Sequence, residues 1–333
     1  MTHELKGIVL HYEKRREKAV LATVVALDGS SYRRPGARMM VFENGDMYGA
    51  VSGGCVEKEV FHQALTVFAT GTPKIMVYDG RYRLGCEGIL YILLEPFGPD
   101  PTFLEGFWGC INARRPFHIA SYYKKEYGED PHCHTRFTFA GEAMPVTAGV
   151  PSQVEGLLRF DQDMAPCFRL LILGAEHDAV QLCQLAAMAG WEVTVVASPR
   201  EEKSERDFPG IHRLIQSEPE ALVHPLDDQT AVMVMSHSFV KDLQFLMALR
   251  GERPAYFGLL GPTKRREKLF GELLERQGDI AENFLEAIHG PAGIDIGAET
   301  PQEIAIAILA EIIATRNGKE AQSLRYLGGK IHS

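Results

Sequence analysis

The stretch Gly29–Glu59, GSSYRRPGARMMVFENGDMYGAVSGGCVEKE, concentrates the unusual residues of this chain. Two apolar runs between Arg38 and Ser52 are joined through Asn44-Gly45, a dipeptide that accepts positive φ at both turn positions. This pattern predicts a β-hairpin whose second strand ends at Ser52-Gly53-Gly54.

A helix is expected directly after the hairpin, because residues 55–68 have apolar side chains at helical spacing. Cys55 then lies at the helix N-terminus, where the helix dipole and unpaired N–H groups favour a thiolate. Ser52, Gly53 and Gly54 are candidate binding residues, since glycines let a ligand approach the backbone. Cys55 is a candidate reactive group, and the alternative of a small buried packing residue stays open.

Three arginines, Arg33, Arg34 and Arg38, precede or open the predicted hairpin. Guanidinium groups beside a glycine-rich turn suit a phosphorylated or otherwise anionic ligand, because each offers planar, permanently charged donors. The alternative is an ordinary solvated loop, since exposed arginines are common.

The residues around this stretch predict an α/β domain over residues 1–97. A second cysteine, Cys86, lies between glycines in the turn Gly85-Cys86-Glu87-Gly88. The expected elements are a helix over 3–18 and strands over 19–27, 74–78 and 89–94.

The amino-acid composition is typical of a globular protein. Its 333 residues are 45% apolar and 24% charged, enough for two domains. We expect a cytoplasmic location, because no apolar run has membrane-spanning length and the start lacks a signal peptide. The net charge of −9 argues against a nucleic-acid partner.

The six cysteines form no C-x-x-C pair, so neither a structural zinc site nor a dithiol motif is predicted. His132-Cys133-His134 is expected to be an exposed loop rather than a metal site, because adjacent strand residues face opposite sides. We assign no metal to this chain.

Residues 98–166 are the hardest part to interpret, with strand-like pieces at 116–123 and 135–139. We treat 98–166 as a connecting region, and the proline- and glycine-containing residues 141–166 as its link to a second domain. That domain is expected to begin near Cys167.

A Rossmann-like, doubly wound parallel sheet is predicted over residues 167–318, followed by a tail over 319–333. It begins with a strand at 169–173, a helix at 178–189 and a strand at 192–197. The helix at 301–313 starts with a capping box.

The phosphate-binding fingerprint of this fold is broken. Of its glycines only Gly174 remains, Glu176 adds a negative charge, and Ala197 stands where an acidic residue contacts the ribose. The sequence therefore argues against NAD(P).

Two later turns lie at the carboxyl ends of predicted strands, where open α/β sheets bind ligands. His237 is a candidate proton carrier or hydrogen-bond donor, and Lys264 with Arg265 is a candidate anion contact. Helix capping alone is the alternative for each turn.

Taken together, GSSYRRPGARM, the hairpin, VSGGCVEKEV and the C-terminal segment over 293–313 resemble the XdhC/CoxI family. Gly85-Cys86-Glu87-Gly88 and His177 are similar to family positions, whereas Glu176, Asp178, Ala179 and Ala197 depart. The resemblance implies a xanthine dehydrogenase accessory protein, a chaperone that carries molybdopterin, the molybdenum cofactor. It also implies that this carrier helps the cofactor acquire sulfur from a cysteine desulfurase and passes it to an apo-hydroxylase.

In residue terms the resemblance makes Cys55 the candidate sulfur acceptor or cofactor contact, and Cys86 is the second candidate. It also implies that Arg33, Arg34 and Arg38 contact the phosphate of the cofactor. Two alternatives stay open: an NAD(P)-dependent oxidoreductase, and a partner protein of the hydroxylase that binds no small molecule. Formation of a homodimer is also open.

Overall fold

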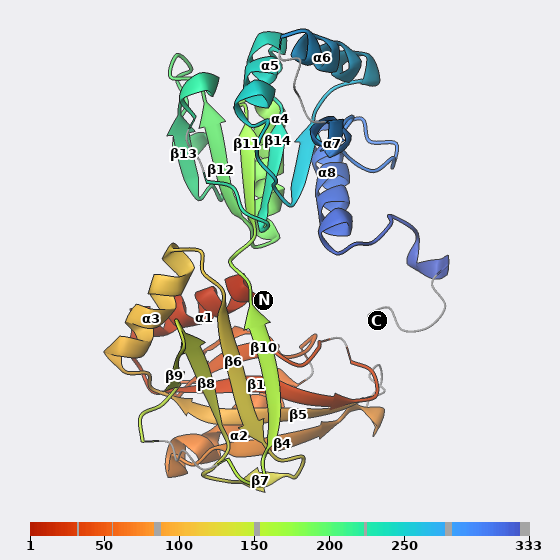
Figure 1. The fold of residues 1–333 in the computed structure, drawn as a ribbon. Coiled ribbons are helices and arrows are strands. Elements are labelled where there is room, and N and C mark those ends of the chain that lie inside the picture. Colours follow the sequence, from red (N-terminus) through yellow and green to blue (C-terminus); the bar gives the residue numbers. More distant parts are fainter. Residues whose placement is uncertain are drawn as a thin grey trace. The chain divides into compact units, whose positions relative to one another are not determined.

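The computed structural model describes residues 1–31, 33–54, 56–82, 88–149, 154–222, 225–276 and 282–326. The chain divides into two compact units, unit 1 at Met1–Pro166 and unit 2 at Cys167–Ser333 (Figure 1). Among the described residues, no helix is both long and apolar enough to cross a membrane.

Unit 1 contains a six-stranded antiparallel sheet in the order β3-β2-β1-β5-β4-β7. The central strand β1 is buried on both faces, as its continuous apolar run predicts. The strands are β1 (Ala19–Asp28), β2 (Arg38–Phe42), β3 (Met47–Gly49), β4 (Lys74–Asp79), β5 (Ile89–Phe97) and β7 (Gly128–Glu129).

Unit 1 also contains a second sheet, in the order β10-β6-β8-β9. Its strands come from residues 98–166, which we expected to be a connecting region. Its strands are β6 (Phe117–Tyr123), β8 (His134–Phe139), β9 (Glu142–Pro145) and β10 (Leu158–Met164). Residues 141–166 thus contain β9 and β10 instead of a plain link. β10 was missed because it is an edge strand whose residues are largely polar and exposed.

Helices cover both faces of the six-stranded sheet. α2 (Glu57–Thr70) packs Val60, Ala64 and Val67 on one face. The other face meets α1 (Thr2–Arg15), α3 (Pro101–Asn112) and the second sheet through an aromatic core. Members of that core include Phe103, Phe107, Phe117, Phe137 and Phe139.

The predicted hairpin is confirmed. β2 and β3 pair from Met39↔Gly49 to Val41↔Met47, and Gly45 in the turn has φ +92°. β3 ends at Gly49, before the expected Ser52, because the side chain of Ser52 takes part in the turn that leads to α2.

Unit 2 is a six-stranded parallel sheet in the order β13-β12-β11-β14-β15-β16, which confirms the Rossmann-like prediction. Its strands are β11 (Arg169–Leu173), β12 (Glu192–Ala197), β13 (Arg213–Gln216), β14 (Thr230–Val234), β15 (Tyr256–Leu259) and β16 (Ile288–His289). The helices are α4 (His177–Met188), α5 (Phe239–Ala248), α6 (Thr263–Arg276), α7 (Glu282–Glu286) and α8 (Pro301–Arg316).

Two apolar cores lie on opposite faces of this sheet. α4 and α8 contribute to one, and α5 and α6 to the other (Figure 1). The capping box of α8 is confirmed, because Thr300 and Glu303 exchange side-chain to backbone hydrogen bonds.

Candidate functional site

The turn that leads into α2 is held by Ser52 and Glu57. Glu57 accepts hydrogen bonds from the N–H and hydroxyl groups of Ser52, both at 2.8 Å. Ser52 Oγ in turn accepts from the N–H groups of Gly54 at 3.1 Å and Val56 at 3.3 Å. The residues on both sides of Cys55 are therefore fixed, although Cys55 itself lies outside the described residues.

Burial opposes ionisation of Glu57, but the hydrogen bonds from Ser52 and Val56 outweigh it and hold the pKa of this carboxyl below its usual value. A negative charge therefore lies beside the turn. Gly54 has φ +115°, and a Cβ added there would meet no atom within 4 Å. The turn thus has open space on the side of Gly54; Gly53 is exposed as well.

The three predicted arginines do not share one surface. Arg33 donates through Nη2 to Glu4 at 2.8 Å and to the carbonyl of Ala50 at 3.1 Å. Arg34 is exposed, whereas Arg38 is only 4% exposed and lies in the core of unit 1. The expectation that all three face one anionic ligand therefore fails for Arg38.

Arg38 is buried because the core supplies polar partners that the sequence did not reveal. Its Nη1 donates to Gln162 at 2.7 Å and to the carbonyl of Gly36 at 3.1 Å. Burial lowers the pKa of Arg38 to about 10, and the charge of Glu95 partly opposes this shift. Glu95 was overlooked because it lies within the apolar run of β5.

The expectation of an exposed loop at His132-Cys133-His134 is wrong for two of these residues, since Cys133 and His134 are fully buried. Cys133 packs in a small apolar cluster, and burial raises the pKa of its thiol to about 11. His134 begins β8 and bonds through Nδ1 to the carbonyl of His132 at 2.7 Å. Within the described ranges, no group of His, Cys, Asp and Glu side chains is suited to a metal ion.

In unit 2, Gly174 follows β11 at the point where the strand order reverses. It has φ +132°, and a Cβ there would lie 2.5 Å from the carbonyl oxygen of Met235. The glycine kept from the nucleotide fingerprint is thus already required by the close approach of two strand ends.

Gly174→Ala is expected to lower the free energy of unfolding of unit 2 by about 2 kcal/mol, because it combines a strained φ with a backbone clash. Urea unfolding followed by Trp191 fluorescence in a Trp108→Phe background measures it, since each unit contains one tryptophan. Gly271→Ala in α6 is the control; with no neighbour within 4 Å, it is expected to stabilise by about 1 kcal/mol. Equal effects of the two substitutions would contradict this role for Gly174.

Polar side chains fill the crevice at this reversal of strand order. Lys241 on α5 forms an ion pair of 2.7 Å with Glu201, which follows β12. His237, after β14, contacts Asp178 on α4 at 3.0 Å. A dinucleotide seated in the space that Lys241 and Glu201 line would have to open this pair.

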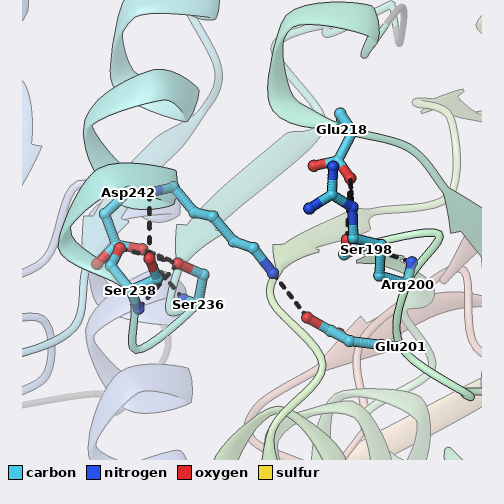
Figure 2. Close-up of polar contacts among 8 residues, drawn as sticks. Ser198, Arg200, Glu201, Glu218, Ser236, Ser238 and Asp242 are labelled. Atoms are coloured by element: carbon cyan, nitrogen blue, oxygen red, sulfur yellow. Dashed lines mark hydrogen bonds and ion pairs between the residues drawn. The ribbon is translucent and has the colours of Figure 1, made fainter.

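Figure 2 shows two carboxylates, Glu201 and Glu218, near Ser198 and Arg200, although β12 itself ends at Ala197. Ser198 donates to Glu218 at 3.1 Å, and Arg200 lies 3.8 Å from the same carboxylate. The space left between Ser198, Glu201 and Ser236 is about 10 Å³, room for one water molecule. Sequence reasoning missed these carboxylates because it considered only the residue that ends the strand.

A larger hollow of about 280 Å³ lies beside β14 and β15, and it brings together two predicted residues, His237 and Arg265. Arg265 Nη2 donates to the buried Asp242 at 2.6 Å. Asp242 also accepts from the N–H and hydroxyl groups of Ser236 (Figure 2). Lys264 is exposed and does not line the hollow, and His177 is exposed at the start of α4.

Comparison with known families gives two matches along the chain. A family model for the XdhC Rossmann domain matches residues 170–312, and one for the XdhC and CoxI family matches residues 13–79. Together they cover most of the sheet in unit 2 and the segment from α1 to β4 in unit 1.

Individual proteins match over nearly the whole chain. A Bacillus subtilis protein, named as a probable subunit of xanthine dehydrogenase, is 28% identical over 90% of this chain and 94% of its own. The molybdenum cofactor insertion chaperone PaoD of Escherichia coli is 26% identical over 92% of this chain and 86% of its own. A crystal structure described as a xanthine dehydrogenase from Bacillus halodurans superposes with a TM-score of 0.76, at 25% identity, and the alignment covers 96% of both chains.

Proposed function

The chain belongs to the XdhC/CoxI family, and from this premise we propose that it is an accessory protein of a molybdenum hydroxylase of the xanthine dehydrogenase type. Its cargo is the molybdopterin cofactor, which it holds, helps to sulfurate and passes to the apo-hydroxylase. The observation that carries the proposal is the similarity, over 92% of the chain, to a protein named as a molybdenum cofactor insertion chaperone. A cysteine desulfurase is the proposed sulfur donor.

Cys55 is the proposed sulfur acceptor or cofactor contact, and Cys86 is the second candidate. Both lie outside the described residues, so support comes from the flanking chain. α2 begins at Glu57, two residues beyond Cys55, and Gly54 leaves open space beside the turn. In the transfer, Cys55 Sγ bonds to the terminal sulfur of the donor's persulfide, and the donor cysteine leaves as a thiolate.

The geometry of unit 2 supports a carrier more than an oxidoreductase. The ion pair Lys241–Glu201 lines the crevice that a nicotinamide dinucleotide would need. Arg33 and Arg34 remain proposed contacts for a cofactor phosphate, whereas the buried guanidinium of Arg38 does not.

The test compares the unmodified protein with Cys55→Ser and Cys86→Ser after loading with molybdopterin. We expect Cys55→Ser to lose retention of the cofactor and activation of an apo-hydroxylase by at least tenfold, and Cys86→Ser to lose less. Equal retention and activation by all three proteins would remove Cys55 from the mechanism.

Native mass spectrometry of the protein, purified without oxygen from a host that makes molybdopterin, tests the function as a whole. A bound mass that matches molybdopterin, together with molybdenum by elemental analysis, supports the carrier. A bound nicotinamide nucleotide supports the oxidoreductase instead. A protein without ligand that still forms a stable complex with a hydroxylase supports the partner protein.

A further inference from the structure

The helix α8 of unit 2 has apolar side chains on two faces. Its inner face, with Ile308, Leu309 and Ile312, packs on the core of the sheet. Its outer face presents Ile306, which is 50% exposed, and Ile313, which is 45% exposed. A helix that is apolar all round is normally buried all round, so the outer face is expected to have a partner.

The surface around these two isoleucines carries little charge. α4, which lies beside α8 on the same face of the sheet, contains one acidic residue, Asp178, and neither lysine nor arginine. Its last residue, Met188, is exposed. By contrast, more than half of the residues of α6, on the opposite face of the sheet, are charged. A surface that is depleted of charged residues and exposes methionine is typical of the centre of a protein interface.

The charged side chains of α8 lie outside the apolar part of its outer face. Glu303 lies in the first turn and Arg316 in the last, and both are exposed. Arg316 lies over the ring of Phe168 at 4.3 Å, and no carboxylate of the described residues pairs with it. Glu311 is half-buried and accepts a hydrogen bond from Tyr256 at 2.6 Å. The outer face therefore has a negative N-terminal end, an apolar middle and a positive C-terminal end.

Such a face is complementary to a second copy of itself. Ala310 is small, half-buried and near the midpoint between the two exposed isoleucines. When two α8 helices cross antiparallel about a two-fold axis near Ala310, Ile306 of one copy meets Ile313 of the other. Glu303 then meets Arg316 of the other copy, and each of these contacts occurs twice. A parallel crossing would bring like charges together instead.

We propose that the outer face of α4 and α8 is the contact between two copies of this chain, with the two α8 helices antiparallel. The opposite charges at the two ends of α8 favour a second copy over an unrelated partner, because they make the face complementary to itself. This contact lies in unit 2 and does not depend on the proposed transfer of molybdopterin.

Sedimentation velocity on the full chain measures the oligomeric state. We expect a dimer with a dissociation constant of about 1 μM or lower. Ile306→Glu and Ile313→Lys are each expected to raise this constant at least about tenfold, because each places an unpaired charge in the interface. The control Leu274→Glu on α6 changes a side chain that is also 45% exposed, and is expected to leave the constant unchanged.

The double variant Ile306→Glu, Ile313→Lys tests the antiparallel arrangement. The carboxylate introduced at position 306 then faces the ammonium group introduced at position 313 of the other copy, so the dimer is expected to be tighter than in either single variant. The two positions are two helical turns apart, so this pair does not form within one copy. Far-UV circular dichroism checks that each variant is folded.

Three results would overturn the proposal. The first is a parent chain that stays monomeric at about 50 μM, well above the expected dissociation constant. The second is a dimer that the two single variants weaken no more than Leu274→Glu does. The third is a double variant that dimerises no better than the single variants, which would exclude the antiparallel contact.

Discussion

Asp242→Ala is expected to lower the free energy of unfolding of unit 2 by about 3 kcal/mol, because it leaves a partly buried cation without its partner. Asp242 is 1% exposed and accepts hydrogen bonds from Arg265 Nη2 at 2.6 Å and from the N–H group of Ser236 at 3.1 Å. Its loss also removes the link between the turn after β14 and the start of α6. In the same variant, the side chains that line the hollow beside His237 and Arg265 are expected to lose their fixed positions.

Urea unfolding followed by Trp191 fluorescence, in the Trp108→Phe background, measures this loss. Asp242→Asn keeps one acceptor oxygen and is expected to cost about half as much, since the charge is lost but not the bond from Ser236. Asp178→Ala is the matched control: it breaks the exposed contact with His237 and is expected to cost less than about 1 kcal/mol. If Asp242→Ala costs no more than Asp178→Ala, the buried ion pair does not stabilise unit 2.

The parts of the fold that could be predicted are those in which a short stretch determines its own structure. The apolar run of β1, the Asn44-Gly45 turn and the capping box of α8 each act through neighbouring residues. β10 could not be recognised in this way. It is stabilised by pairing with β6, more than thirty residues earlier in the chain, and its exposed edge carries polar residues.

The candidate site was less predictable for the same physical reason. The pairs Lys241–Glu201, Arg265–Asp242 and Thr135–Glu95 join residues 40, 23 and 40 positions apart. No local pattern reveals such contacts. His237 and Arg265 were found because parallel strands place their carboxyl ends at one edge, a rule that needs only the strand order.

The ionisation of Glu95 is expected to lower the free energy of unfolding of unit 1 by about 3 kcal/mol as pH rises from 4.5 to above 7. Burial raises the pKa of this carboxyl from 4.5 to about 7, against the opposing hydrogen bonds from Thr135 and the charge of Arg38. Between these values the folded chain keeps a proton that the unfolded chain has lost. The stabilisation by this group is therefore full below pH 4.5, falls as pH rises from 4.5 to about 7, and is lost above pH 7.

The comparison of the unmodified chain with Glu95→Gln isolates this effect, because carboxyls with a lowered pKa, such as Glu57 and Asp130, give the opposite slope in both proteins. Urea unfolding followed by Trp108 fluorescence, in a Trp191→Phe background, reports on unit 1. The stability of the parent relative to Glu95→Gln is expected to fall by about 2.5 kcal/mol between pH 5 and pH 8. A constant difference would show that Glu95 ionises as easily in the folded chain as in the unfolded one.

Arg38 supplies a second test of the same argument. Its positive charge adds to the hydrogen bonds from Thr135 in opposing the rise of the pKa of Glu95, so Arg38→Met is expected to extend the fall in stability to higher pH. Two of its nitrogens, Nε and Nη2, have no hydrogen-bond partner among the described residues. Removal of the guanidinium therefore costs less free energy of unfolding than it would if every nitrogen were hydrogen-bonded. If the fall stays at the same pH in Arg38→Met, the charge of Arg38 does not affect the ionisation of Glu95, and burial together with the Thr135 hydrogen bonds sets it.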